Sequence, residues 1–216
     1  MSQVIGVVQG KGGTGRSTVS TNLAGGLSTH YPTALIDCDM PQGTSASWAA
    51  LRHAEKRMGN LTIATAPTHR SLVDQAKRLG QTHRFLVVDA PPRIAEITRA
   101  ILILSSLVVI PIGPSAAEVW ATTDVLKTIE EARAHRPNLL ARLLWTRIRR
   151  RTKVAQQIPG AVNEELHVQS LKSVLGQRVA YTEALACGRT VSEWGDPVAR
   201  QELDALVTEV VRVVGR

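Results

Sequence analysis

Cysteine and aromatic side chains are scarce in this sequence of 216 residues, which has two cysteines and 3% aromatic residues. Cys38 and Cys187 show no spacing typical of a disulfide framework or a metal site, which indicates a cytoplasmic protein. With so few aromatics, the core has to be built from Val, Ile, Leu and Ala. No apolar run could span a bilayer, and no signal peptide precedes Val4. The length fits one domain, which we expect to cover residues 1–216.

Acidic residues are missing between Ala132 and Asn163, although the whole chain contains 18 of them. The formal net charge is +8, and eight basic residues fall in this one stretch: Arg133, Arg136, Arg142, Arg147, Arg149, Arg150, Arg151 and Lys153. A solvated basic face is the simplest explanation of such a run. Because the eight charges have no counter-charge nearby, we favour a polyanionic partner.

Apolar strands and helical stretches alternate along the chain. The expected strands are Val4–Val8, Thr33–Asp39, Leu61–Ala66, Arg84–Pro92, Leu107–Ile112, Leu143–Ile148 and Val168–Val174. The expected helices are Ser17–Leu27, Ser45–Met58, Leu72–Leu79, Ala117–His135, Val179–Ala186 and Pro197–Val214. Strands this apolar are buried on both faces, which predicts an α/β fold with a mainly parallel twisted sheet and helices on both faces. Ligands bind such sheets at the carboxyl ends of the strands.

A glycine-rich loop, GKGGTGRST, follows the first expected strand. It fits the phosphate-binding pattern G-x-x-x-x-G-K-[ST], as in the fold of P-loop nucleotide hydrolases, except that Arg16 takes the place of the lysine. Glycines let backbone N–H groups turn toward phosphate oxygens, and the next helix points its N-terminus at the same anion. The Ser17 hydroxyl would bind a magnesium ion. The expected nucleotide-binding residues are Gly10, Lys11, Gly12, Gly13, Thr14, Gly15, Arg16, Ser17, Thr18 and, from a later strand, Thr146.

Three aspartates end strands that we expect beside this loop. Asp89 ends the strand FLVVD, as a Walker B aspartate does, and Asp37 and Asp39 end the strand ALIDCD. Because strand side chains alternate, Asp37 and Asp39 share one face and Cys38 points to the other. One aspartate at a strand end is often a helix cap, but three around one loop favour a magnesium-dependent site.

The loop from Lys11 to Ser17 resembles the signature K-G-G-x-G-K-[ST] of the ParA/MinD family of deviant Walker A ATPases. The stretch DCDMPQGTSASW is similar to the family's D-x-D-P-Q segment, with Met40 as a departure. The stretch VIPIGPSAAEVWA is similar to its P-x-x-P-S segment, with Glu118 where an aspartate is common. The resemblance covers almost the whole chain and is greatest to the short, ParF-like or carboxysome-positioning McdA-like branch.

The resemblance implies an ATPase that works as a switch. ATP and Mg²⁺ would close a homodimer, in which Lys11 of one subunit reaches the phosphates held by the other. Asp39 would orient the attacking water, and Asp37 and Asp89 would support magnesium together with Ser17. The dimer would bind nucleoid DNA without sequence preference and leave it when an adaptor on the cargo (plasmid, chromosome or carboxysome) stimulates hydrolysis. We expect no stable membrane association. The expected DNA contacts are Arg147, Arg149, Arg150, Arg151, Lys153 and Arg178.

Arg16 leaves the extent of catalysis open. Guanidinium is planar, bulkier than ammonium and always charged, so we expect it to neutralise phosphate oxygens while unstimulated hydrolysis stays slow. A nucleotide-binding module without catalysis is therefore one alternative. A second is a membrane-cycling, MinD-like ATPase, although Glu202, Asp204 and Glu209 dilute the basicity of the last helix and favour core packing. A third is an iron–sulfur relative, which would need bridging cysteines, whereas Cys38 is expected to be buried.

Overall fold

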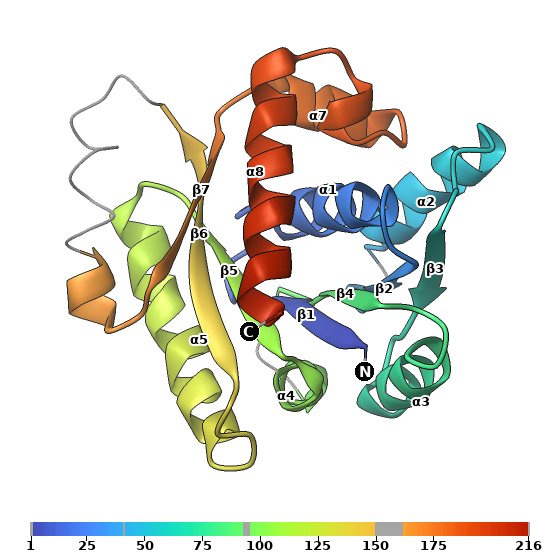
Figure 1. Cartoon of the computed structure of the whole chain (residues 1–216). Coiled ribbons are helices and arrows are strands. Elements are labelled where there is room, and N and C mark those ends of the chain that lie inside the picture. The colour runs from blue at the N-terminus through green and yellow to red at the C-terminus, as the bar shows by residue number, and fades with distance from the viewer. Residues whose placement is uncertain (1, 41, 93–95, 150–161, 216) are drawn as a thin grey trace.

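The computed structural model describes residues 2–40, 42–92, 96–149 and 162–215 (Figure 1). Its strands are β1 (Gln3–Val7), β2 (Thr33–Asp37), β3 (Leu61–Thr65), β4 (Phe85–Asp89), β5 (Leu107–Ile112), β6 (Leu140–Ile148) and β7 (Ser170–Gly176). Its helices are α1 (Arg16–Ser28), α2 (Thr44–Ala54), α3 (His69–Leu79), α4 (Glu96–Leu104), α5 (Ala116–Arg133), α7 (Val179–Ala186), the 3₁₀ turn η1 (Val191–Glu193) and α8 (Pro197–Val214). A short helical segment also covers 162–166.

The strands form one seven-stranded parallel sheet in the order β3-β2-β4-β1-β5-β6-β7. Strand β1 lies at the centre, between β4 and β5; β2 and β3 lie beyond β4, and β6 and β7 lie beyond β5. The predicted α/β architecture with a mainly parallel sheet is therefore confirmed. The centre of the sheet is also the position at which such folds bind ligands.

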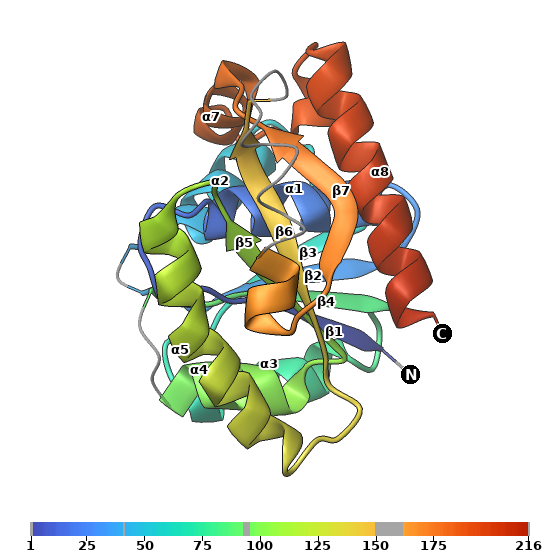
Figure 2. The same cartoon turned by 90° about the vertical axis from the view of Figure 1, so that its left-hand side faces the viewer.

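Helices cover both faces of the sheet, as Figures 1 and 2 show. Alternate residues of each strand point to opposite faces of the sheet and belong to two separate cores. Ile5 and Val7 of β1 pack in the core under α1, α2, α7 and α8, whereas Val4 packs in the core formed with α3, α4 and α5. The strands are buried on both sides, which explains their unbroken apolar sequence. Aliphatic residues dominate both cores, as the scarcity of aromatics predicts.

Helix α1 sits unusually close to its neighbours, and it is the helix that carries the glycine-rich loop. A Cβ on Gly25 would lie 2.3 Å from Thr190, and one on Gly26 would lie 2.7 Å from Val207 of α8. These two glycines therefore allow α1 to pack against η1 and α8.

Most of the predicted elements are present, with shifts of a few residues at their ends. Helix α4 was not predicted, because its sequence EITRAILIL is largely apolar and runs almost directly into β5. The 3₁₀ turn η1 was also missed. Helix α8 packs its apolar side into the core through Ala199, Leu203, Leu206 and Val210, in agreement with the core-packing interpretation of the last helix.

Candidate functional site: a phosphate-binding loop at the centre of the sheet

The glycine-rich loop connects β1 to α1 at the carboxyl edge of the sheet. Gly13 and Gly15 have φ angles of 76° and 91°, a left-handed conformation that favours glycine, and Gly15 is the N-cap of α1. A Cβ on Gly12, Gly13 or Gly15 would meet no protein atom within 4 Å. Internal packing therefore does not explain the glycine at position 12, whereas the close approach of an anion does.

Side chains hold several carbonyl groups of this loop. Thr146 donates from Oγ1 to the carbonyl of Thr14 at 3.3 Å, and the hydroxyl of Thr14 donates to the carbonyl of Lys11 at 3.3 Å. Arg16 donates to the carbonyls of Gln9 and Lys11, both at 2.8 Å. In a trans peptide the N–H points away from the carbonyl. Fixing the carbonyls on one side therefore turns the following N–H groups to the other, where a phosphate would accept from them.

Arg16 is buried, with 7% of its surface exposed, and it joins the ends of three strands. Besides its two bonds to the loop, its Nε donates to the carbonyl of Ala90, which follows β4, at 3.1 Å. Its Nη2 lies 3.9 Å from Oδ2 of Asp39, which follows β2. Burial lowers the pKa of Arg16, and the charges of Asp89 and Asp39 oppose that effect. Three of its donors are thus bonded to backbone, a role that the sequence did not predict.

Asp89 is fully buried and surrounded by serine hydroxyls. Ser20 donates to Oδ1 at 3.0 Å and Ser45 donates to Oδ2 at 2.7 Å. Burial raises the pKa of Asp89 to about 6, and hydrogen bonds from Ser45, Ser17 and Ser20 act in the opposite direction. A carboxylate next to the Ser17 hydroxyl offers the oxygen ligands that magnesium prefers.

The other two aspartates flank Cys38 in the sequence, at the end of β2. Asp37 is buried, and its carboxylate accepts the backbone N–H of Asp39 at 2.9 Å and that of Ala46, in the first turn of α2, at 2.8 Å. Burial raises the pKa of Asp37 in spite of these two bonds. Asp37 thus caps α2, and Asp39 remains the aspartate that faces Arg16.

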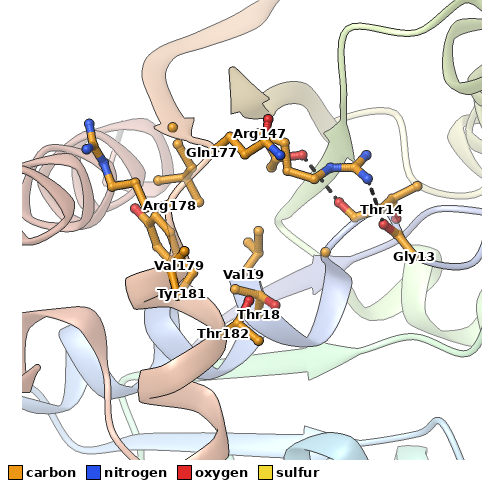
Figure 3. A pocket seen from close by; sticks show the side chains of 14 residues that line it. Gly13, Thr14, Thr18, Val19, Arg147, Gln177, Arg178, Val179, Tyr181 and Thr182 are labelled. Atoms are coloured by element: carbon orange, nitrogen blue, oxygen red, sulfur yellow. Dashed lines mark hydrogen bonds between the residues drawn. The ribbon is translucent and has the colours of Figure 1, made fainter. Parts of the chain in front are cut away.

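A cavity of about 360 Å³ adjoins the loop and the start of α1. Figure 3 shows its walls, with Thr14 and Arg147 on one side and Arg178 and Tyr181 on the other. The lining residues are Gly13, Thr14, Gly15, Thr18, Val19, Thr146, Arg147, Leu175, Gly176, Gln177, Arg178, Val179, Tyr181 and Thr182. The cavity lies next to the phosphate-binding loop, where a nucleoside would extend from bound phosphates.

The arginines expected to contact DNA occupy different surroundings. Arg147 is bonded to Glu118 and to the loop, and Arg178 donates to Glu202 at 2.9 Å. Both line the cavity beside the phosphate-binding loop. Arg149 is exposed and donates from Nε to Gln177 at 2.7 Å. Arg150, Arg151 and Lys153 lie outside the described residues.

Several residues of the site were missed in the sequence. Ser45 and Ser20 donate hydrogen bonds to Asp89. Of the two, only Ser20 could have been predicted from the sequence, because it lies one helical turn beyond Ser17. Gln9, which precedes the loop, is fully buried; its amide donates to Thr122 of α5 at 3.0 Å, and its Oε1 accepts from the N–H of Gly10. A polar residue directly before a glycine-rich loop is only a weak indication that its side chain links the loop to a neighbouring helix.

Comparison with known proteins decides the family. Residues 5–191 match the CobQ/CobB/MinD/ParA nucleotide binding domain. The chain belongs to this family. It is 30% identical over 204 residues to the maintenance of carboxysome distribution protein A (McdA) of Halothiobacillus neapolitanus, covering 93% of each chain. It is also 26% identical over 222 residues to the chromosome-partitioning ATPase Soj of Thermus thermophilus, covering 88% of this chain and 87% of Soj.

Solved structures agree on the fold. An ATP complex of an aspartate-to-alanine variant of McdA from Cyanothece has a TM-score of 0.78 at 16% identity, covering 99% of this chain and 96% of that one. The cell division ATPase MinD of Pyrococcus furiosus has a TM-score of 0.81 at 17% identity, covering 99% of this chain and 100% of MinD. The family match over residues 5–191 confirms the resemblance to the ParA/MinD family drawn from the loop. Among the described helices, none has the length and apolar character needed to cross a membrane.

Proposed function

We propose that this chain is an ATP-dependent positioning ATPase that cycles on DNA. The observation that carries the proposal is the loop, whose carbonyls are held by side chains while Lys11 is exposed. Asp39 lies 3.9 Å from Arg16 of the same loop. The similarity to McdA over 93% of both chains supports positioning as the purpose. In this proposal the whole chain, residues 1–216, acts as a single ATPase domain.

The described residues fit ATP and magnesium. The space in front of Gly12, Gly13 and Gly15 suits phosphates, and the adjoining cavity suits the nucleoside. Ser17 and the buried Asp89 would hold magnesium, with Asp37 in support; the ion, when bound, would neutralise charge on the phosphates. Asp39 would orient the attacking water.

The switch requires two subunits and two further partners. We propose that ATP closes a homodimer in which each Lys11 reaches the partner's phosphates, and that the dimer holds nucleoid DNA through phosphate contacts. An adaptor on the cargo would stimulate hydrolysis and release the dimer. DNA co-sedimentation with ATP, ADP or no nucleotide tests this cycle. We expect DNA binding in the presence of ATP, and no binding with ADP or without nucleotide. Equal binding under all three conditions would contradict the cycle.

Asp39 gives a prediction that separates hydrolysis from dimer closure. Asp39→Ala should lower ATP turnover by about 10²–10⁴-fold, the usual contribution of a positioned proton acceptor. ATP binding and dimerisation should persist, because the phosphates are held by the loop. The variant should therefore stay on DNA with ATP, as measured by dissociation from immobilised duplex. Asp39→Asn, which keeps the shape and removes the charge, is the matched variant; normal hydrolysis in either one would contradict this role.

A second prediction concerns the basic run. Wild-type DNA affinity should be indifferent to sequence and should fall with salt, with a slope of about −0.9 per phosphate neutralised. Changing Arg149, Arg150 and Arg151 together to Glu should abolish DNA binding and spare ATP-dependent dimerisation. The control makes the same change at three exposed basic residues of α3: Arg70, Lys77 and Arg78. If the control loses DNA binding and the first variant keeps it, the DNA surface lies elsewhere.

The alternatives make different demands on the structure. A membrane-cycling ATPase needs an available apolar face on α8, whereas Leu203, Leu206 and Val210 pack in the core. An iron–sulfur relative needs a reactive pair of cysteines, whereas Cys38 is buried and its pKa is raised by that burial. A nucleotide-binding module without turnover rests on Arg16, and an ATPase assay of the wild type tests it.

A further inference from the structure

Arg147 and Glu118 form an ion pair beside the phosphate-binding loop. The Nη2 of Arg147 donates to both carboxylate oxygens of Glu118 at 2.6 Å, and its Nη1 donates to the carbonyl of Gly13 at 3.0 Å. Glu118 also accepts the N–H of Gly113 at 2.6 Å and the hydroxyl of Ser115 at 3.3 Å. One guanidinium therefore joins the middle of the loop to the start of α5; the dashed line that ends at Gly13 in Figure 3 marks its bond to the loop.

The backbone of Arg147 is strained. Its φ is 56°, in the left-handed region that residues other than glycine rarely adopt, and the register between β6 and β7 shifts between Trp145 and Ile148. A strained residue persists where its surroundings hold it, and such residues gather at functional sites. The conformation lies at this irregularity near the end of β6, from which the Arg147 side chain reaches the carbonyl of Gly13.

Gly113 is matched to this pair. A Cβ at that position would lie 2.5 Å from Nη2 of Arg147 and 2.9 Å from Oε2 of Glu118. In the observed geometry the ion pair leaves no room for a Cβ at residue 113, so the ends of the two side chains would have to move. Gly113 therefore provides a way to push the two charged groups apart without removing either of them.

The residue before Arg147 acts on the same part of the loop. Thr146 donates to the carbonyl of Thr14, and Arg147 donates to the carbonyl of Gly13, so consecutive residues of β6 hold consecutive loop carbonyls. Holding the carbonyl of Gly13 fixes the plane of the Gly13–Thr14 peptide, and with it the N–H of Thr14 on the opposite side. That N–H is one of the donors that a phosphate-binding loop offers.

We propose that Arg147, oriented by Glu118, is a positioning residue for bound nucleotide: it holds the Gly13–Thr14 peptide with its N–H toward the phosphates. The inference rests on the proposed function, in which the loop holds ATP. This role differs from the DNA contact predicted from sequence. The charge of Arg147 is paired with Glu118, and its Nη1 is bonded to the carbonyl of Gly13 in the loop. The pair would act on the polyphosphate part of the ligand, where the loop N–H groups bind.

Calorimetric titration with ATP and with AMP tests this role in Arg147→Ala, Glu118→Gln and Gly113→Ala. Each variant should bind ATP about 10- to 100-fold more weakly, the usual effect of losing one charge-assisted bond. AMP affinity should change far less. Arg147→Lys should recover only part of the ATP affinity, because an ammonium cannot bond Glu118 and Gly13 in one planar fork. Arg70→Ala, on exposed α3, is the control and should bind both nucleotides normally.

The outcomes distinguish the inference from its rivals. Equal losses of ATP and AMP affinity, or wild-type ATP affinity in Arg147→Ala and Gly113→Ala, would overturn it. A loss of DNA affinity in Arg147→Ala at saturating ATP, with nucleotide binding unchanged, would return Arg147 to the DNA surface. A wild-type chain that binds no ATP would overturn the proposed function as well, so the two failures differ. Circular dichroism melting shows whether each variant is folded.

Discussion

Replacing Lys11 with alanine is expected to remove ATP-dependent dimerisation while ATP binding by the single subunit stays close to wild type. Lys11 is exposed, and its carbonyl is held by Arg16 and Thr14, so the backbone is fixed while the side chain faces outward. In a two-fold dimer each subunit would contribute one lysine. A charge-assisted hydrogen bond contributes about 1.5–3 kcal/mol, so two lost bonds correspond to about 3–6 kcal/mol, or a dimer ~10²–10⁴-fold weaker.

Sedimentation velocity with ATP and Mg²⁺ measures the dimer, and titration with ATP measures binding to the subunit. Lys127→Ala is the matched control, since it removes an exposed lysine of α5 that pairs with Asp124 at 3.7 Å. The control should dimerise normally, and Lys11→Ala should also lose DNA binding. If Lys11→Ala still dimerises with ATP and keeps its DNA affinity, Lys11 does not act across the interface.

The sequence predicts the architecture well because the relevant signals are local. The unbroken apolar runs of β1 and β4 require burial on both faces, and the glycines of the loop require left-handed or open backbone. The positions of Asp39 and Asp89 follow from the parallel sheet, in which all carboxyl ends meet at one edge. These features can be predicted without knowing which helices pack against which strands.

The partners of the arginines could not be read in the same way. Arg147 pairs with Glu118, 29 residues away in sequence, and Arg178 pairs with Glu202, 24 residues away. Sequence shows a basic run with no acidic residue inside it, whereas the fold brings Glu118 of α5 to Arg147 of that run, and Glu202 of α8 to Arg178 beyond it. The sum of charges along a stretch is therefore a weaker guide to a DNA surface than the charges that remain unpaired after folding.

The last large effect is expected from Arg16→Lys, which should raise ATP turnover about tenfold, equivalent to ~1.4 kcal/mol of transition-state stabilisation. In the structure the Nε and Nη1 of Arg16 are bonded to three carbonyls, which leaves Nη2 facing Asp39. A lysine ammonium is a compact charge that can follow the γ-phosphoryl group as negative charge develops on it. It would also free Asp39 from the neighbouring guanidinium.

The same geometry predicts a cost in stability. Arg16→Lys cannot keep all three carbonyl bonds, and Arg16→Ala keeps none, so the carbonyls of Gln9 and Ala90 would lose a partner in buried surroundings. Each unsatisfied buried group costs about 1–3 kcal/mol. The melting temperature should therefore fall from wild type to Arg16→Lys to Arg16→Ala, and Arg16→Ala should also lose ATP affinity through a disordered loop.

Steady-state ATPase assays of the three proteins, with and without DNA, separate ground-state binding from catalysis. Interactions of equal strength in the ground and transition states change KM and leave kcat unaltered. A guanidinium that braces the loop should therefore support ATP binding without matching the transition state, and Arg16→Lys should raise kcat with little change in KM. If lysine slows hydrolysis instead, the loop has adapted to the guanidinium and Arg16 is itself catalytic. If the wild type shows no turnover even with DNA and its adaptor, the chain is a nucleotide-binding module without catalysis.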